Sequence, residues 1–392
     1  MTLFLLGVSA FGSMVAMRIC DAMLIALGQE FQVTTGDASA VASAFAVCYG
    51  LMQLLFGPLG DRIGKLRVVL MATWGCALFS AMTAFAPSFG WLVFCRAATG
   101  VFAAGIVPLS VAWIGDTVTI DRRQETLARF MGAALTGMMA GQWLGGVALN
   151  SIGWRPAFVA LAGVMGLAAM VLARQTATAL REEARQSTAR VNLAAYGRNM
   201  VRLFRLPRVR WVLGATALEG VLAYGALAFF PSQLVAAFGF TPAGAGSTMV
   251  LFGIGGLLYS QLARHWLALL GDRGLAGIGG ALVAAALLVL AWTPSSALAA
   301  GACFVAGLGL YMLHNTLQTQ ATQMAPEVRG TAVALFAGVL FLAQSVGVWA
   351  IGVALDQGQL AVSFSVAATG LVALGLWIAQ FLLSGRTRTA KQ

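Results

Sequence analysis

Residues 57–67 read Gly-Pro-Leu-Gly-Asp-Arg-Ile-Gly-Lys-Leu-Arg, and they separate two long apolar runs. Four of these eleven residues carry a charge. A charged side chain costs about 2.5–3.5 kcal/mol at the centre of a bilayer, so this turn belongs in water at one face of a membrane. Each flanking run is long enough to cross the hydrocarbon core, which takes about 20 apolar residues. The stretch therefore predicts a helical hairpin with an aqueous turn.

The whole chain has the composition of a membrane protein. It has 392 residues, of which 60% are hydrophobic and 9% are charged, and its mean hydropathy is +0.86. A soluble domain carries roughly 25% charged residues. The apolar runs predict an all-α, multi-pass membrane protein with twelve spanning helices in two pseudo-symmetric six-helix bundles. The expected helices are 5–28, 38–59, 68–87, 90–113, 129–150, 154–173, 211–235, 244–264, 274–292, 296–320, 329–350 and 361–384.

The basic residues gather on one side of this topology. The formal net charge is +11, from 24 basic and 13 acidic residues. Arg18 and Arg96 fall inside apolar runs and Arg155 in an outer loop, whereas the other 21 basic residues lie in turns or tails on the opposite side. Basic loops stay in the cytoplasm. We therefore expect both termini there, in a bacterial-type cytoplasmic (inner) membrane, and the distribution argues against nucleic-acid binding.

The longest polar stretch, residues 174–210, separates the two expected bundles at 1–173 and 211–392. It holds nine arginines, and its second part, 191–210, interleaves apolar and basic residues. That spacing suits an amphipathic helix on anionic lipid headgroups. A flexible basic linker is the alternative, and in both cases the stretch is expected in the cytoplasm.

The two halves form a parallel repeat at an offset of 207 residues. Residues 31–35, Phe-Gln-Val-Thr-Thr, correspond to residues 238–242, Phe-Gly-Phe-Thr-Pro. The same offset carries 57–67 onto a second short charged turn and Arg122 onto Arg329. Three matches in one register, all at equivalent topological positions, indicate duplication of a six-helix unit, which is a known transporter plan.

The 57–67 turn resembles the loop between helices two and three of the major facilitator superfamily. That loop has the pattern Gly-x-Leu-Ala-Asp-Arg-x-Gly-Arg-Arg, and here Gly60 stands in place of the alanine. The matching residues are Gly57, Leu59, Asp61, Arg62, Gly64 and Lys65. The six-plus-six plan extends the resemblance over the whole chain, and it implies a secondary transporter.

The resemblance also implies a latch at the cytoplasmic side, formed by Gly57, Asp61, Arg62, Gly64, Lys65 and Asp116. Asp61 is expected near the start of the eleventh helix, close to Gly330, because a helix N-terminus attracts negative charge. Lys65 is expected to pair with Asp116 at the inner end of helix four. The alternative is a positive turn that only sets topology.

Two further stretches are similar to motifs of the drug:proton antiporter branch. Residues 92–100 resemble the family's second motif, whose intramembrane arginine, here Arg96, serves in proton coupling. The fifth helix resembles the antiporter motif Gly-x3-Gly-Pro-x2-Gly-Gly, with Gln142 in place of its proline. The glycines that would pack helices closely are Gly137, Gly141, Gly145 and Gly146. A plain packing face is the alternative interpretation.

Four charged residues lie inside the apolar runs, and such residues are functional by default. They are Arg18, Asp21, Arg96 and Glu219. Asp21 and Arg96 lie about 10 Å and 9 Å from the outer ends of helices one and four, at 1.5 Å per residue, so they can face one another across a cavity. We expect these four residues to couple proton movement to transport. A static ion pair is the alternative for Asp21 and Arg96.

The substrate cavity is expected to include Gln142, His314, Asn315 and Gln318. Glu219 is a second protonation site or a cation contact, or it reaches interfacial water. His314 either titrates near physiological pH or packs as a neutral polar group. Gln142 binds substrate or bridges helices, and the sequence does not separate these two roles.

The resulting hypothesis is proton-driven export of a small organic compound or drug, with uptake of a metabolite by symport or facilitated diffusion as the alternative. The expected partners are a small-molecule substrate, protons and the lipid bilayer. We expect a monomer that uses the proton gradient and no cofactor or metal. An enzyme is disfavoured, because His265 and His314 are the only histidines and no HExxH spacing occurs.

Overall fold

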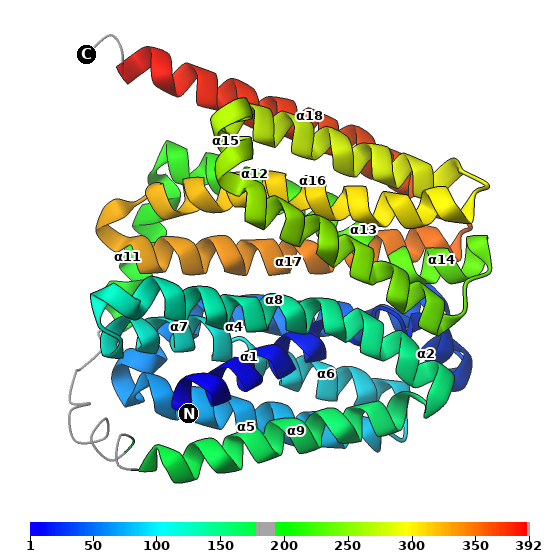
Figure 1. The fold of residues 1–392 in the computed structure, drawn as a ribbon, viewed down its shortest axis with the longest axis horizontal. Helices are drawn as coiled ribbons and strands as arrows, with labels where there is room; N and C mark the ends of the chain where they lie inside the picture. The colour runs from blue at the N-terminus through cyan, green and yellow to red at the C-terminus, as the bar shows by residue number, and fades with distance from the viewer. Residues whose placement is uncertain (178–179, 181–192, 390–392) are drawn as a thin grey trace.

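The computed structural model describes residues 1–177, 180 and 193–389, and nearly all of them are helical (Figure 1). The first half contains α1 (Thr2–Arg18), α2 (Leu24–Phe31), α3 (Thr35–Ala38), α4 (Ala40–Ile63), α5 (Lys65–Ala84), α6 (Phe89–Ala103), α7 (Ile106–Thr117), α8 (Ile120–Ser151) and α9 (Trp154–Gln175). The second contains α11 (Leu193–Arg205), α12 (Pro207–Glu219), the π-helix η1 (Gly220–Tyr224), α13 (Gly225–Leu227), α14 (Phe230–Phe238), α15 (Pro242–Trp292), α16 (Ser296–Gln323), the 3₁₀-helix η2 (Pro326–Val328), α17 (Arg329–Asp356) and α18 (Leu360–Thr389).

These helices join end to end into twelve rods in two groups of six, which lie side by side in Figure 1. Nine helical stretches in the described residues are long and apolar enough to cross a membrane, and α15 is counted once among them. The rod formed by α1 and α2, the glycine-rich α8 and the second part of α15 complete the twelve. Gly271, with φ 62° and ψ 173°, divides α15 in two. The predicted all-α fold of two six-helix bundles is confirmed.

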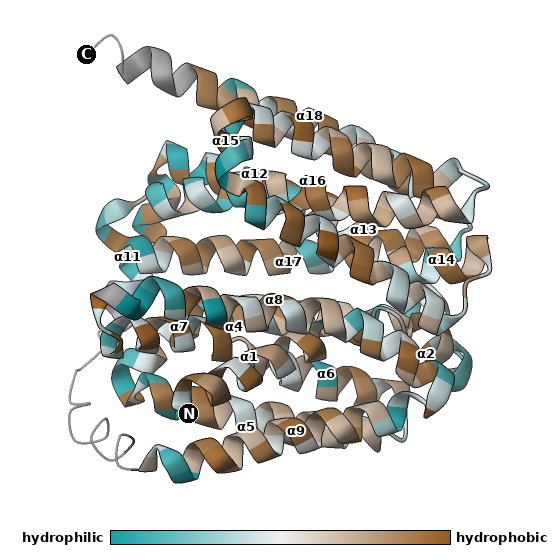
Figure 2. Ribbon diagram, in the orientation of Figure 1, coloured by the Kyte–Doolittle hydropathy of each residue, from teal (hydrophilic) through white to brown (hydrophobic). Residues whose placement is uncertain are grey.

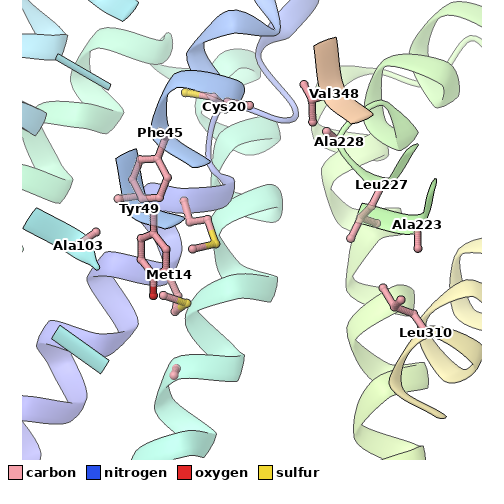
Figure 3. Packing of buried hydrophobic residues seen from close by; sticks show 14 of the residues in the cluster. Met14, Cys20, Phe45, Tyr49, Ala103, Ala223, Leu227, Ala228, Leu310 and Val348 are labelled. Atoms are coloured by element: carbon pink, nitrogen blue, oxygen red, sulfur yellow. The ribbon is translucent and has the colours of Figure 1, made fainter. Parts of the chain in front are cut away.

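Hydropathy divides the molecule along the rods. Figure 2 shows hydrophilic residues gathered toward the two ends and mainly apolar residues between them. We call the end with both chain termini and α11 the basic end, and the end with Glu30, Asp37 and Asp356 the acidic end. Buried apolar side chains fill the middle of each half, among them Phe45 and Leu227 in Figure 3.

The structure corrects three of the predicted helices, one of which, 90–113, is interrupted at residues 104–105 between α6 and α7. The sequence predicts continuous helices over 5–28 and 211–235. Instead, the first rod is interrupted at residues 19–23 between α1 and α2, and the seventh passes through η1 and a turn at 228–229. Hydropathy reports only how apolar a segment is, so it cannot show where the backbone hydrogen bonding changes.

The backbone conformation supports the 207-residue repeat within two of the matched stretches. Gln32 ends α2 with φ 55°, and its equivalent Gly239 ends α14 with φ 67°. Gly64 separates α4 from α5 with φ 98°, and its equivalent Gly271 breaks α15 with φ 62°. A left-handed residue at both members of each pair shows that the turns of the two halves have equivalent geometry.

Close helix packing follows the same register. A Cβ on Gly100 of α6 would overlap the carbonyl oxygen of Phe45 in α4. A Cβ on Gly307 of α16 would overlap the carbonyl oxygen of Phe252 in α15. Gly100 and Phe45 lie 207 residues before Gly307 and Phe252, respectively. The α4–α6 helix crossing of the first half therefore recurs as the α15–α16 crossing of the second.

The two halves meet along two pairs of helices, α4 with α17 and α8 with α15. At the acidic end, the Asp356 carboxylate of α17 accepts hydrogen bonds from Thr34 Oγ1 at 2.6 Å and from the Gly36 backbone N–H at 2.9 Å. Near the middle, a Cβ on Gly50 of α4 would come 2.9 Å from the Gly338 carbonyl oxygen of α17. These contacts join the halves from the acidic end to the middle of the molecule.

The polar stretch between the halves lies partly outside the described residues. From 193 onward it forms α11, which carries Arg202 and Arg205 in its last turn. Val201 and Phe204 of α11 are exposed, whereas Leu203 is buried. A helix forms here, as predicted, and its position on a lipid surface stays a prediction.

Candidate functional site

The first rod is interrupted at Asp21. Between α1 and α2 the backbone hydrogen bonds join residues three apart instead of the four of an α-helix. They run from Asp21 N to Arg18 O at 3.1 Å and from Met23 N to Cys20 O at 2.8 Å. Discontinuous helices near the bilayer midplane are typical of binding sites in transporters. The repeat-equivalent position in the seventh rod, residue 228, is also a turn. The two breaks therefore lie at equivalent positions in the two halves.

Asp21 holds a buried polar cluster together. Its Oδ2 accepts hydrogen bonds from Arg18 Nη1 at 3.2 Å and from Gln142 Nε2 at 3.0 Å. Arg18 and Asp21 are each 1% exposed, and Gln142 is 3% exposed. Gln142 thus bridges α8 and the first rod, which was one of its two predicted roles. The cluster is an ion pair with a neutral hydrogen-bond donor, enclosed by apolar helices.

A ladder of glycines sets the distance between α8 and α1. A Cβ on Gly137, Gly141 or Gly145 would come within 2.8 Å or less of a carbonyl oxygen in the facing first rod. The oxygens belong to Phe11, Val15 and Ile19, which share the same four-residue spacing. A Cβ on Gly146 would instead meet the carbonyl oxygen of Pro242, where α15 begins. The ladder brings Gln142 within reach of Asp21, and Gly146 fits α8 against the other half.

Arg96 is buried against an aromatic ring of α4. The sequence suggests that it faces Asp21, but its guanidinium carbon lies 4.6 Å from the centroid of the Phe45 ring, and its Nε donates to Val41 O at 3.4 Å. It is 0% exposed, and Nη1 and Nη2 have no hydrogen-bond partner among the described residues. Arg18 is the cation that contacts the carboxylate, because it ends α1 only three residues before Asp21 in the chain. Arg96 does not contact Asp21 directly in this conformation, although its charge acts on the Asp21 carboxylate, and its role in proton coupling stays a prediction.

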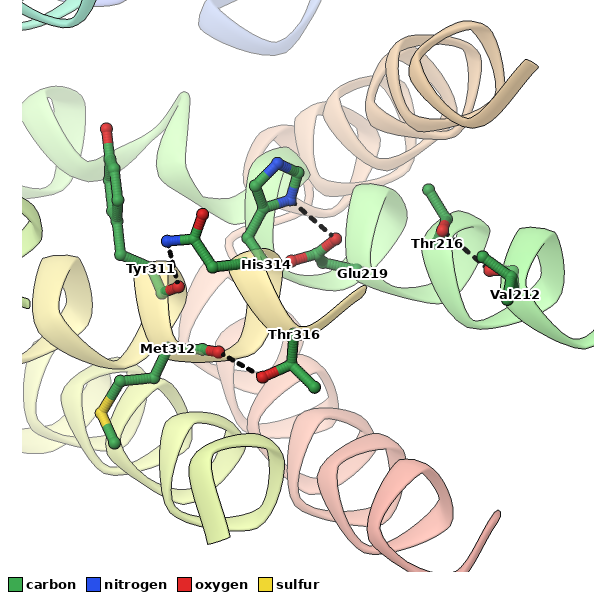
Figure 4. Close-up of polar contacts among 8 residues, drawn as sticks. Val212, Thr216, Glu219, Tyr311, Met312, His314 and Thr316 are labelled. Atoms are coloured by element: carbon green, nitrogen blue, oxygen red, sulfur yellow. Dashed lines mark hydrogen bonds and ion pairs between the residues drawn. The ribbon is translucent and has the colours of Figure 1, made fainter. Parts of the chain in front are cut away.

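A second buried carboxylate lies in the other half. Glu219 ends α12 immediately before the π-helix and is 0% exposed. Its Oε2 lies 3.1 Å from His314 Nδ1 of α16 (Figure 4). Its Oε1 has no hydrogen-bond partner among the described residues. Asn315 turns back to Tyr311 O at 2.9 Å, and Gln318 is exposed. Of the predicted polar residues in this half, the structure brings only Glu219 and His314 together.

Tyr224 connects the two clusters, and the sequence analysis missed it. Arg18 Cζ lies 5.9 Å from the centroid of the Tyr224 ring. The same ring meets His314 edge-on, with centroids 5.7 Å apart and planes at 72°. A path of neighbouring polar and aromatic groups thus runs from Asp21 through Arg18 and Tyr224 to His314. The only sequence signal for Tyr224 is its place five residues after Glu219.

At the basic end, Lys65 Nζ and the Asp116 carboxylate form the expected ion pair between α5 and α7. Arg62 is exposed in the last turn of α4, and a Cβ on Gly57 would meet open space.

The sequence places Asp61 against α17, and the structure adds a residue there, Tyr196 of α11. Tyr196 lies beside Thr331 in the first turn of α17. Burial, and secondarily the nearby Asp61 carboxylate, raise the pKa of Tyr196. Tyr196 is therefore a shared neighbour of Asp61 and α17.

A family comparison decides the class of this site. Residues 6–348 match the model of the Major Facilitator Superfamily. The chain belongs to this superfamily. It is 25% identical over 348 residues to the uncharacterized MFS-type transporter YceJ of Bacillus subtilis (strain 168), covering 88% of this chain and 85% of that one.

Two relatives with functional names differ from one another. The chain is 24% identical over 312 residues to the probable L-galactonate transporter of Escherichia coli (strain K12), covering 74% of this superfamily member and 67% of the relative. It is 28% identical over 134 residues to the multidrug efflux pump LfrA of Mycolicibacterium smegmatis (strain ATCC 700084 / mc(2)155). This match covers 34% of this chain and 27% of LfrA. The crystal structure of the nucleoside transporter NupG superposes with a TM-score of 0.78 at 13% identity, covering 97% of this chain and 99% of that one. These likenesses support a transporter rather than an enzyme.

Proposed function

We propose that this protein is a secondary active transporter that exports a small organic compound or drug in exchange for protons by alternating access. The observation that carries the proposal is the pair of buried carboxylates, Asp21 and Glu219, on either side of the interface between the halves. Each is almost fully buried and has a basic side chain as its close partner. Buried carboxylates with so few partners are suited to taking up and releasing protons.

The coupling would act through Arg18. Protonation of Asp21 removes the negative charge that lies 3.2 Å from the guanidinium. An uncompensated buried cation is strongly destabilising, so Arg18 would have to move toward another partner or toward substrate. Its neighbour in the other half is Tyr224, beside His314 and Glu219. A proton on Asp21 would thereby change the contact between the two halves.

The remaining expectations fit into the same proposal. The bundles 1–173 and 211–392 would rock against each other in the inner membrane, with both termini and the 174–210 linker in the cytoplasm. Arg96 would respond electrostatically to Asp21, and the exposed Gln318 would contact substrate. The ion pair of Lys65 with Asp116 would brace the basic end. We propose that one chain suffices and that the proton gradient is its energy source.

A second function, uptake of a small organic anion, has its own support. Arg96 Nη1 and Nη2 and Arg18 Nη2 lack hydrogen-bond partners among the described residues, and a carboxylate could satisfy such donors. The relative named as a probable L-galactonate transporter is of this kind. Gln142, which stands where the antiporter motif has proline, also weakens the case for export.

Transport by purified protein in liposomes tests both functions. Under an imposed pH gradient, ethidium serves as a cationic probe and L-galactonate as an anionic one. Export by exchange requires ethidium to move against the proton flux, and Asp21→Asn protein should lose this movement. Galactonate moving together with protons would instead establish uptake. If neither pH gradient nor Asp21→Asn changes the flux of a transported probe, proton coupling through Asp21 is wrong.

A further inference from the structure

A cavity of about 770 Å³ opens at the basic end of the second half, away from the central clusters. Four separate segments form it, namely the start of α12, the break in α15, the last turns of α16 and the later part of α18. The lining residues that matter most are Arg208, Asp272, Arg273, Gln320 and Gln323. Its size is within the usual range for a small-molecule site.

The repeat explains why this space is open. In the first half, Lys65 and Asp116 form an ion pair between α5 and α7. The equivalent residues, 207 positions later, are Asp272 and Gln323, and both line the cavity. An acid and an amide cannot form the ion pair that joins the equivalent helices of the first half. The position of that bridge is thus left as a cavity.

Two arginines make this cavity basic. Arg273 stands where the first half has the buried Leu66, and its Nη2 donates to Leu382 O at 3.4 Å. Arg208 Nη2 donates to Oε1 of Gln320, which is 5% exposed, at 3.1 Å. These two hydrogen bonds, made with described residues, use one nitrogen of each guanidinium, and a guanidinium has five N–H donors. With Asp272, the formal charge of the lining is +1, which complements a monoanion.

The rest of the lining is apolar. Phe381 and Leu382 line the cavity from α18, and Leu270 does so from α15. The Phe381 ring stacks on Trp211, with centroids 3.6 Å apart and planes at 11°. Tryptophan is enriched at the level of lipid headgroups. The cavity therefore offers guanidinium donors beside an apolar wall at the end of the transmembrane rods.

We infer that this cavity binds the phosphate of an anionic phospholipid from the leaflet at the basic end. A phosphodiester carries one negative charge and accepts hydrogen bonds from arginine with good geometry. The acyl chains would leave along the apolar wall of α18. Basic pockets between transmembrane helices are suited to anionic headgroups. The inference is independent of the transported substrate and of the direction of transport.

The test measures lipid binding by the whole purified protein in dodecyl maltoside micelles. Dioleoylphosphatidylglycerol is titrated and binding is followed by native mass spectrometry and by thermal shift. The double substitution Arg208→Gln with Arg273→Gln should weaken binding at least about tenfold, because it removes both charged hydrogen-bond donors for the phosphate. Arg129→Gln is the matched control, since Arg129 is an exposed arginine at the basic end of the other half.

A second variant separates shape from charge. Asp272→Lys with Gln323→Asp introduces the ion pair of the first half and leaves both arginines in place. Its formal lining charge is higher, so simple attraction would strengthen lipid binding, whereas filling of the cavity should weaken it several-fold. Equal binding of phosphatidylglycerol by wild type and both double variants would overturn the inference. Glycerol 3-phosphate binding as tightly as phosphatidylglycerol would also overturn it, because the ligand would then be a water-soluble anion.

Discussion

Removal of the Asp21 charge should destabilise the protein, and removal of the Arg18 charge as well should restore most of the loss. In Asp21→Asn, the side chain keeps its size, but Arg18 is left as a cation that is 1% exposed. Breaking a buried ion pair by neutralising one partner costs about 3–5 kcal/mol, whereas replacing both partners by neutral groups is often close to neutral. We therefore expect Arg18→Gln with Asp21→Asn to be more stable than either single variant.

The pair should be examined as a double-mutant cycle, which isolates the coupling between two residues in contact. Unfolding in detergent micelles by a denaturant titration gives the four free energies. We expect a coupling of about 3 kcal/mol or more for Arg18 and Asp21. Transport should respond differently, since the stabilised double variant still lacks the titratable carboxylate and should stay uncoupled from protons. A coupling below about 0.5 kcal/mol, or a double variant with normal proton coupling, would refute the reasoning.

Three further outcomes follow from the geometry. Gly145→Ala should lower the free energy of unfolding by about 1–3 kcal/mol, because the added Cβ forces α8 away from the first rod. Gly132→Ala should not lower it, because its Cβ would meet open space. A denaturant titration measures both variants. Lys65→Gln should change the free energy of unfolding by less than about 1 kcal/mol, because the ion pair of Lys65 with Asp116 is partly exposed. The same variant should slow transport if the ion pair braces the basic end. Equal transport rates of the variant and the wild type would contradict that role. Tyr196→Phe should loosen α11, seen as faster proteolysis beside it. Since the pKa of Tyr196 is raised, the contact of Tyr196 with α17 should persist below about pH 10 and weaken as the pH rises through the raised pKa. Equal proteolysis of wild type and Tyr196→Phe at neutral pH would contradict this role of Tyr196.

The features that could be predicted from sequence are those set by hydropathy, charge and glycine. The charged turn at 57–67 and the 207-residue repeat are of this kind. Each depends on charged residues that lipid excludes or on a backbone conformation that glycine permits, whereas the pairing of Lys65 with Asp116 was implied by the family resemblance. Fold class and helix order follow from the same preferences. The transport roles of the named residues stay predictions, because geometry alone does not test them.

The local partners of the buried charges could not be predicted. Depth alone placed Asp21 opposite Arg96, whereas Arg18, three residues before Asp21 in the chain, is the cation that contacts the carboxylate. Tyr224 was missed because a tyrosine in an apolar run has no distinctive spacing. Its role depends on η1, whose π-helical turn changes which way residues after Glu219 face. The partners of these buried charges are determined by packing between segments that are distant in the sequence.

Duplication kept the backbone of the two halves more faithfully than their chemistry. The break at Asp21 recurs at residue 228, but there the residue is alanine, and the acid of the second half, Glu219, lies two turns earlier. The turn at Gly64 recurs at Gly271, but the ion pair beside it becomes an acid and an amide lining a cavity. Backbone geometry at these turns is fixed by packing and by left-handed residues, so it survives substitution of the exposed or cavity-facing side chains. Exposed and cavity-facing side chains are therefore free to diverge. This explains how two halves with equivalent backbones hold different ion-pair partners. At the basic end it explains a brace in one half and an anion-binding cavity in the other.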